Sequence, residues 1–108
     1  MSKNSSKRGA VSKGHDLYRF RLFIAGDEVN SIRAKTNLFH LAQTYLSDRH
    51  EIIVVDVMED YQAALDFNIM AVPTLLVENP FERVIVGSLS DEKAVLDTLG
   101  LIFESDPQ

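Results

Sequence analysis

Hydrophobic residues in the first half of the chain form two strand-like runs separated by a helix-like stretch. The run YRFRLFIA at residues 18–25 alternates at first and then becomes fully apolar, as is typical of a strand whose far end enters a sheet interior. The run EIIVVDV at residues 51–57 is rich in β-branched residues and predicts a buried parallel strand. Between them, helical spacing of apolar positions predicts a helix over residues 31–47, with Asn30 as its N-cap. The apolar positions that define this helix are Ile32, Leu38, Phe39, Ala42, Tyr45 and Leu46. Together the three elements predict a right-handed βαβ unit.

Two further helices are predicted in the second half of the chain. Asp60 is placed to cap a short helix that ends near Asn68. Ser90 is placed to cap a last helix whose first turn holds two acidic residues, which favour the helix dipole. Gly100 is placed to end this last helix.

A hairpin is predicted between these two helices. Apolar runs at residues 74–77 and 83–86 flank the turn-forming sequence ENPFE, which indicates two antiparallel strands. Pro73 stands at the entrance of the first strand, and Gly87 ends the second. The complete order is therefore βαβαββα, an α/β fold with a mixed sheet.

Composition narrows the class of protein. The 108 residues fit one domain, and a hydrophobic content of 45% is enough for a single core. The absence of cysteine excludes disulfides, thiolate metal sites and CxxC redox chemistry. No apolar run approaches the ~20 residues of a membrane helix, and the N-terminus lacks the apolar core of a secretory signal. We therefore expect a cytoplasmic protein without a membrane partner.

Charge is distributed unevenly along the chain. Residues 1–14 hold four basic residues and no acid, and subtracting their charge from the total of −5 leaves −9 for the remainder. The negative charge of this remainder argues against a nucleic-acid partner, because phosphate binding relies on clustered Lys and Arg. Residues 1–16 are predicted to be a disordered basic tail, with a partner-binding arm as the minor alternative. The folded domain is expected over residues 17–104, followed by a flexible C-terminus at 105–108.

Candidate chemistry is sparse. Asp56, Glu59 and Asp60 form the densest acidic group, but a strand end followed by a helix cap explains them better than a Mg²⁺ site, since no phosphate-binding loop accompanies them. The three histidines show no ligand spacing, and serines near helix starts read as caps. We therefore predict no catalytic residue, no cofactor and no metal, and hence no enzyme.

Several motifs carry a family resemblance. The element order, together with Ile-x-x-Val-Pro-Thr-Leu at residues 69–75, resembles the thioredoxin arrangement, which implies a cis peptide bond at Pro73. Where thioredoxins have CxxC, this chain reads GDEVNSIR at residues 26–33, which resembles the KaiB family, whose first strand ends in Ala-Gly and whose helix begins Asn-Ser-x-Arg-Ala. Further stretches that resemble KaiB follow in the same order: Val55-Asp56-Val57, Ala71-x-Pro73-Thr74-Leu75 and Val86-Gly87-Ser88-Leu89-Ser90.

This resemblance implies a non-enzymatic regulator that binds a KaiC-type ring ATPase in a circadian or stress-response system. The residues it suggests for partner binding are Arg33, Lys35 and Arg83, and those for structure are Gly26, Asn30, Pro73 and Gly87. Clock members carry several lysines in the second half that this chain lacks, so its partner could be an ATPase other than that of the cyanobacterial clock. An alternative function is that of a thioredoxin-like stress-response protein without thiol redox activity. A homo-oligomer, dimer or tetramer, is a further possibility.

The resemblance also implies two possible folds for the second half. Some KaiB members switch between a thioredoxin-like arrangement and a ground state with a rearranged second half. Clock members have a glycine where Thr98 stands here, and an interior glycine costs about 1 kcal/mol of helix stability relative to alanine. We therefore expect the thioredoxin-like state to predominate.

Overall fold

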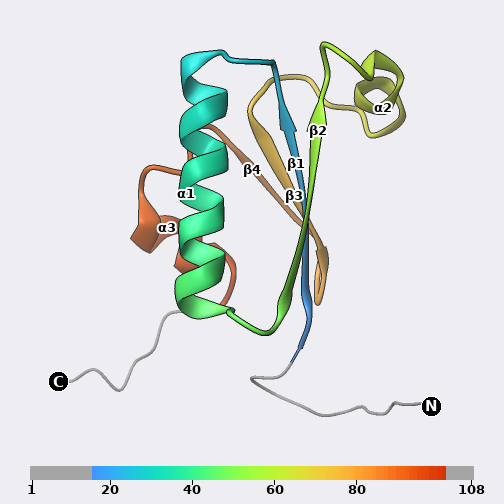
Figure 1. The fold of residues 1–108 in the computed structure, drawn as a ribbon. Coiled ribbons are helices and arrows are strands. Elements are labelled where there is room, and N and C mark those ends of the chain that lie inside the picture. The colour runs from blue at the N-terminus through green and yellow to red at the C-terminus, as the bar shows by residue number, and fades with distance from the viewer. Residues whose placement is uncertain (1–15, 102–108) are drawn as a thin grey trace, which may run out of the picture.

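The computed structural model describes residues 16–101, and the elements follow the predicted order (Figure 1). They are β1 (Tyr18–Ile24), α1 (Val29–Tyr45), β2 (His50–Asp56), α2 (Tyr61–Asp66), β3 (Thr74–Asn79), β4 (Arg83–Val86) and α3 (Glu92–Thr98). Apart from Asp16, the predicted tail at 1–16 lies outside the described residues, as does the C-terminus at 105–108. None of the helices in the described part of the chain is long and apolar enough to cross a membrane.

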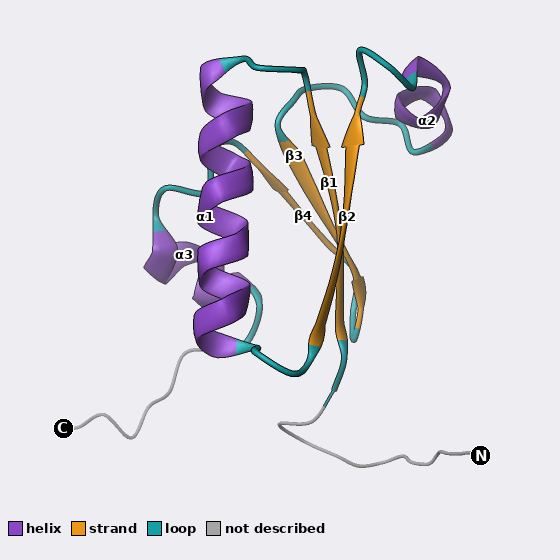
Figure 2. Ribbon diagram, viewed as in Figure 1, coloured by secondary structure: helices purple, strands orange, loops and turns teal. Residues whose placement is uncertain are grey.

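Four strands form one mixed sheet in the order β2-β1-β3-β4. β1 runs parallel to β2 and antiparallel to β3, and β4 is antiparallel to β3. Helices α1 and α3 lie on one side of this sheet, whereas the short α2 lies beyond its other side, at the end where β1 and β2 finish (Figure 2). The predicted mixed-sheet βαβαββα fold is confirmed, with the second half in the thioredoxin-like arrangement.

The core lies between the sheet and the two helices α1 and α3. Alternate residues of β1 point into it, and Phe20 and Leu22 are fully buried. α1 contributes Ala34, Leu38, Leu41 and Ala42, which recur three and four residues apart. The apolar positions that predicted this helix do not all face the core, since Ile32 and Phe39 are 45% and 46% exposed. The buried stripe is centred on Leu38, so these two side chains fall on its flank.

Both N-caps predicted from Asn and Ser residues lie elsewhere. Asn30 is inside α1, because the helix begins at Val29 and the carboxylate of Glu28 accepts the Ser31 N–H at 2.9 Å. Likewise Asp91, and not Ser90, caps α3 by accepting the Ala94 N–H at 3.1 Å. In both places a carboxylate one or two residues from the expected cap makes the bond, and carboxylates also suit the positive end of the helix dipole.

The remaining structural residues lie where the sequence predicted. The Val72–Pro73 bond is cis, and Pro73 directly precedes β3. Gly26 has a φ of 50° just after β1, and Gly87 has a φ of 119° just after β4. Side chains rarely adopt this backbone region, so glycine is suited to both turns. Asp60 caps α2, as predicted, by accepting the Ala63 N–H at 3.1 Å.

Tyr18 ties the start of β1 to the end of α3. Its hydroxyl donates to the Leu99 carbonyl at 2.8 Å, and the side chain is 6% exposed. Burial raises the pKa of the Tyr18 phenol above its usual value, so the hydroxyl keeps the proton that it donates. The Phe81 ring packs edge-on against the Tyr18 ring at 6.1 Å, which closes this end of the core.

Tyr18→Phe removes this buried donor and leaves the Leu99 carbonyl without it. We expect the free energy of unfolding to fall by about 1–3 kcal/mol in urea titrations, because an unsatisfied buried acceptor loses its solvation. Tyr61→Phe is the matched control, since Tyr61 is 67% exposed. A Tyr18→Phe effect as small as that of the control would contradict the role given to this bond.

Candidate functional site

The loop between β1 and α1 is held by main-chain hydrogen bonds. The Asp56 carboxylate accepts the Gly26 N–H at 3.0 Å and the Met58 N–H at 2.9 Å, which joins the ends of β1 and β2. The buried Ser31 hydroxyl accepts the Ala25 N–H at 3.0 Å. Asp56 is therefore used to fix the backbone, in line with the prediction that it is a structural carboxylate. No group of three or more His, Cys, Asp or Glu residues that could hold a metal occurs within residues 16–101.

One surface of α1 carries apolar and basic side chains together. We call it the α1 face and define it as Val29, Ile32, Arg33, Lys35 and Phe39. Val29 and Arg33 are four residues apart, Ile32 and Lys35 three, and Lys35 and Phe39 four, so the side chains of each of these pairs are neighbours on the helix. Val29 is 59% exposed and Phe39 is 46% exposed, so this surface groups exposed apolar side chains with the two cations.

The two cations of the α1 face are available for contacts. Arg33 is exposed and Lys35 is half-buried. The ion pairs within the described residues join Arg19 to Glu51 and Arg21 to Glu78, and neither involves Arg33 or Lys35. Because α1 begins at Val29, Arg33 lies in its second turn, away from the end where the dipole would disfavour a cation.

Arg83, the third predicted partner-binding residue, lies at the other end of the molecule. It begins β4 opposite Val77, whereas α1 begins beside the far end of the sheet, where Val86 pairs with Thr74 (Figure 1). Its guanidinium lies 5.0 Å from the Phe81 ring centroid and donates to the Glu82 carbonyl at 2.8 Å. The structure therefore brings Arg33 and Lys35 onto one helix but does not bring Arg83 to them.

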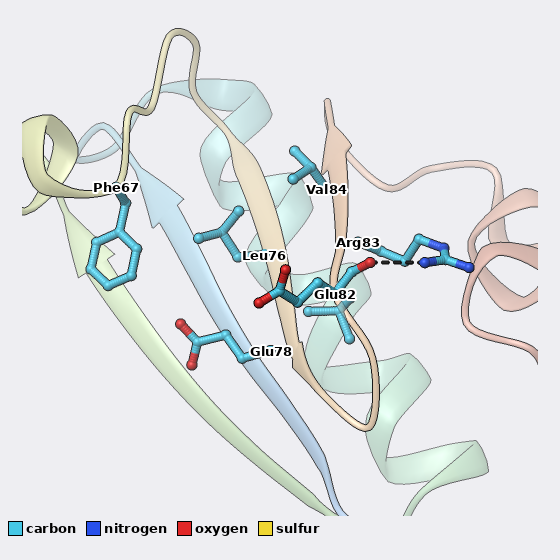
Figure 3. Close-up of a pocket in the computed structure, with 7 residues that line it drawn as sticks. Phe67, Leu76, Glu78, Glu82, Arg83 and Val84 are labelled. Atoms are coloured by element: carbon cyan, nitrogen blue, oxygen red, sulfur yellow. Dashed lines mark hydrogen bonds between the residues drawn. The ribbon is translucent and has the colours of Figure 1, made fainter.

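A groove on the sheet face opposite α1 went unrecognised in the sequence. It has a volume of about 580 Å³ and is lined by Phe67, Leu76, Val77, Glu78, Glu82, Arg83 and Val84. Figure 3 shows Arg83 extending away from Leu76 and Glu78. Arg21 lies across this sheet face, with a 2.7 Å ion pair to Glu78 and its guanidinium 4.8 Å from the Phe67 ring centroid. The sequence of β3 contains a signal for the groove, since residues on both faces of this strand are apolar. Only in the structure is it clear that the short α2 leaves the face opposite α1 open.

The histidines show no shared site. His40 is exposed on α1, and the Nδ1 of His50 lies 2.6 Å from the Leu46 carbonyl at the end of that helix. His15 lies outside the described residues. The geometry thus offers two surfaces suited to binding, the α1 face and the groove.

Comparisons with known proteins agree on one family. The family model described as the KaiB domain matches residues 21–101. The circadian clock oscillator protein KaiB of Acaryochloris marina is 39% identical over 95 residues, covering 87% of this chain and 91% of that protein. The same-named protein of Prochlorococcus marinus is 40% identical over 88 residues (81% and 75%), and the circadian clock protein KaiB3 of Synechocystis is 35% identical over 86 residues (78% and 83%).

Solved structures support the fold. The thioredoxin Deadhead of Drosophila melanogaster has a TM-score of 0.64 at 15% identity, covering 83% of this chain and 85% of that one. Chloroplastic thioredoxin z has a TM-score of 0.67 at 17% identity, covering 79% and 77%. The predicted thioredoxin-like fold is thereby confirmed.

The Glu28 cap makes the start of α1 sensitive to pH. Hydrogen bonds from the backbone N–H groups of Asn30 and Ser31 hold the Glu28 pKa below its usual 4.5. Because the folded-state pKa is lowered, the stabilisation is fully present above pH 4.5 and is lost as the pH falls through the folded value. We expect a lower protection factor at the Ser31 amide, its exchange rate being compared with the intrinsic rate at the same pH, in acid and at neutral pH in Glu28→Ala, both measured by NMR. Glu59→Ala, which removes another exposed carboxylate, should leave hydrogen exchange at the Ser31 amide unchanged. An equal change in Glu59→Ala and Glu28→Ala would contradict the role given to the Glu28 cap.

Proposed function

This chain belongs to the KaiB family, and we propose that it is a non-enzymatic regulatory protein that binds a KaiC-type ATPase in a circadian or stress-response signalling system. The relatives that support the proposal are named as clock oscillator proteins and span most of the chain. A cytoplasmic ATPase of this type would place the protein in the cytoplasm.

The observation that carries the proposal is the α1 face. Here exposed apolar side chains lie next to an arginine that forms no ion pair within residues 16–101. Protein interfaces favour this composition, because aromatic and aliphatic groups supply buried area and arginine supplies directed hydrogen bonds. Phe39 provides the largest apolar side chain of this face, and Arg33 provides an exposed cation. We propose that Ile32, Arg33 and Phe39 contact the ATPase, with Lys35 at the margin.

The start of α1 supports binding rather than catalysis. Thioredoxins carry their redox cysteines at this position, next to the cis-proline loop, whereas this chain contains no cysteine. Here the same position holds Gly26 and Glu28, whose roles are a turn and a helix cap. The rigid loop then serves to fix where α1 begins and how its outer surface is presented.

The test is direct binding between the purified full chain and a KaiC-type ATPase of the same organism, measured by native mass spectrometry with ATP and with ADP. We expect a stable complex in at least one nucleotide state. Arg33→Ala and Phe39→Ala should each raise Kd by about tenfold, or about 1.4 kcal/mol, as is usual for central interface residues.

Arg83→Ala is the matched control, because Arg83 is also an exposed arginine but lies at the opposite end of the sheet. Its Kd should stay within about twofold of the unchanged chain, which is the range for residues outside an interface. An equal loss in Arg33→Ala and Arg83→Ala would contradict docking through the α1 face. Absence of a complex in every nucleotide state would contradict the proposed partner.

A further inference from the structure

The face of the sheet opposite α1 carries an open groove with an apolar floor. The groove has a volume of about 580 Å³ and extends from Phe67, at the end of α2, to the β3–β4 hairpin (Figure 3). On its floor Leu76 pairs with Val84, which is 63% exposed. Arg83 also lines the groove but extends away from Leu76 (Figure 3). An exposed apolar surface with a polar rim usually marks a place where another segment binds.

The surroundings of the groove are acidic. Residues 51–82, which include most of β2 and all of α2 and β3, contain seven acidic residues and no Lys or Arg. At the hairpin end of the groove, Glu78 is paired with Arg21 at 2.7 Å, whereas Glu82 forms no ion pair in the described part of the chain. At the other end, the α2 residue Asp66 is exposed. The groove therefore suits a segment with a cation at each end and an apolar residue between them.

The chain enters the fold at the hairpin end of this groove. Arg19, the second residue of β1, pairs with Asn79, the last residue of β3. The side-chain amide of Asn79 also donates to the Leu17 carbonyl. Leu17 therefore lies beside the β3–β4 hairpin, which carries Glu82, and Figure 1 shows β1 beginning at this end of the sheet. Residues 1–15, which lie outside the described part, are thus joined to the fold next to the groove.

We propose that residues 7–13 (KRGAVSK) of this chain bind in the groove as an extended segment. Alternate side chains of an extended chain share a face, so Lys7, Val11 and Lys13 point the same way. Seven extended residues span about 23 Å, close to the roughly 20 Å of the six-residue β3. With Lys13 at Glu82, Val11 lies over the apolar floor and Lys7 reaches the α2 end.

The connection between the segment and β1 allows this path. Gly14 follows the segment directly, and glycine adopts the backbone conformations of tight turns without steric cost, so the chain can reverse there and run back over the sheet. Because the segment is tethered, it meets the groove at an effective concentration in the millimolar range. A contact too weak to hold a separate basic peptide is then still occupied, which favours the chain's own segment. The residues of the α1 face take no part, so the proposal does not depend on the ATPase partner.

A spin label tests the position of the segment in the full chain. The chain has no cysteine, so Ser12→Cys gives a single attachment point for a nitroxide, on the outward face of the extended segment. In the ¹⁵N-labelled protein the nitroxide should weaken the amide NMR signals of Leu76 and Val84 far more than that of Phe39, which lies on α1, on the other side of the sheet (Figure 2). Equal weakening of all three signals, or of none, would overturn the proposal and leave the groove to a separate partner.

A charge reversal tests the electrostatic part of the contact. Glu82→Lys should reduce the signal loss at Leu76 and Val84 by about two- to fivefold, because it turns an attraction for Lys13 into a repulsion. Asp97→Lys is the matched control, since Asp97 is exposed on α3, on the other side of the sheet, and the net charge changes equally. This control should leave the signal loss unchanged. Equal effects of the two variants would indicate attraction by net charge alone and would overturn binding in the groove.

A mixed sample distinguishes the chain's own segment from that of a second copy. Spin-labelled chain without ¹⁵N is mixed with ¹⁵N-labelled chain that carries no nitroxide. We expect the Leu76 signal of the mixture to keep its intensity, because the groove of each chain is occupied by its own segment. A loss as large as that in the singly labelled chain would mean that the segment binds another copy, which contradicts the proposal.

Discussion

The structure depends on one strand, β1, which pairs with another strand on each of its edges and packs against the helices on its core face. Phe20 and Leu22 are fully buried against the helices, while the backbone pairs in parallel with β2 and antiparallel with β3. A parallel neighbour requires a crossover, which α1 supplies over the core face. An antiparallel neighbour brings the start of β3 to the end of β1, where Phe23 pairs with Thr74. The loop after β1, the Asp56 carboxylate and Pro73 meet at this edge for that reason.

Where apolar residues recur regularly along the chain, the sequence predicted the secondary structure closely. The predicted bounds of β4 agree with the structure, and β1 and β2 differ by a residue at their ends, because the strands are marked by runs of apolar and β-branched residues even where, as in β2 and β4, they lie at the edge of the sheet. The helix caps differ from the prediction because Glu28 lies two residues from Asn30 and Asp91 lies next to Ser90, and local sequence does not decide which side chain closes the turn.

The candidate site was harder to predict because it depends on which apolar residues stay exposed. Ile32 and Phe39 fit a helical period as well as Leu38 does, and only the packing of α1 on the sheet separates them. Similarly, Arg83 resembles Arg33 in residue type, yet the antiparallel hairpin carries it to the opposite end of the sheet. Sequence alone identified the residues, but topology decided which of them can act together.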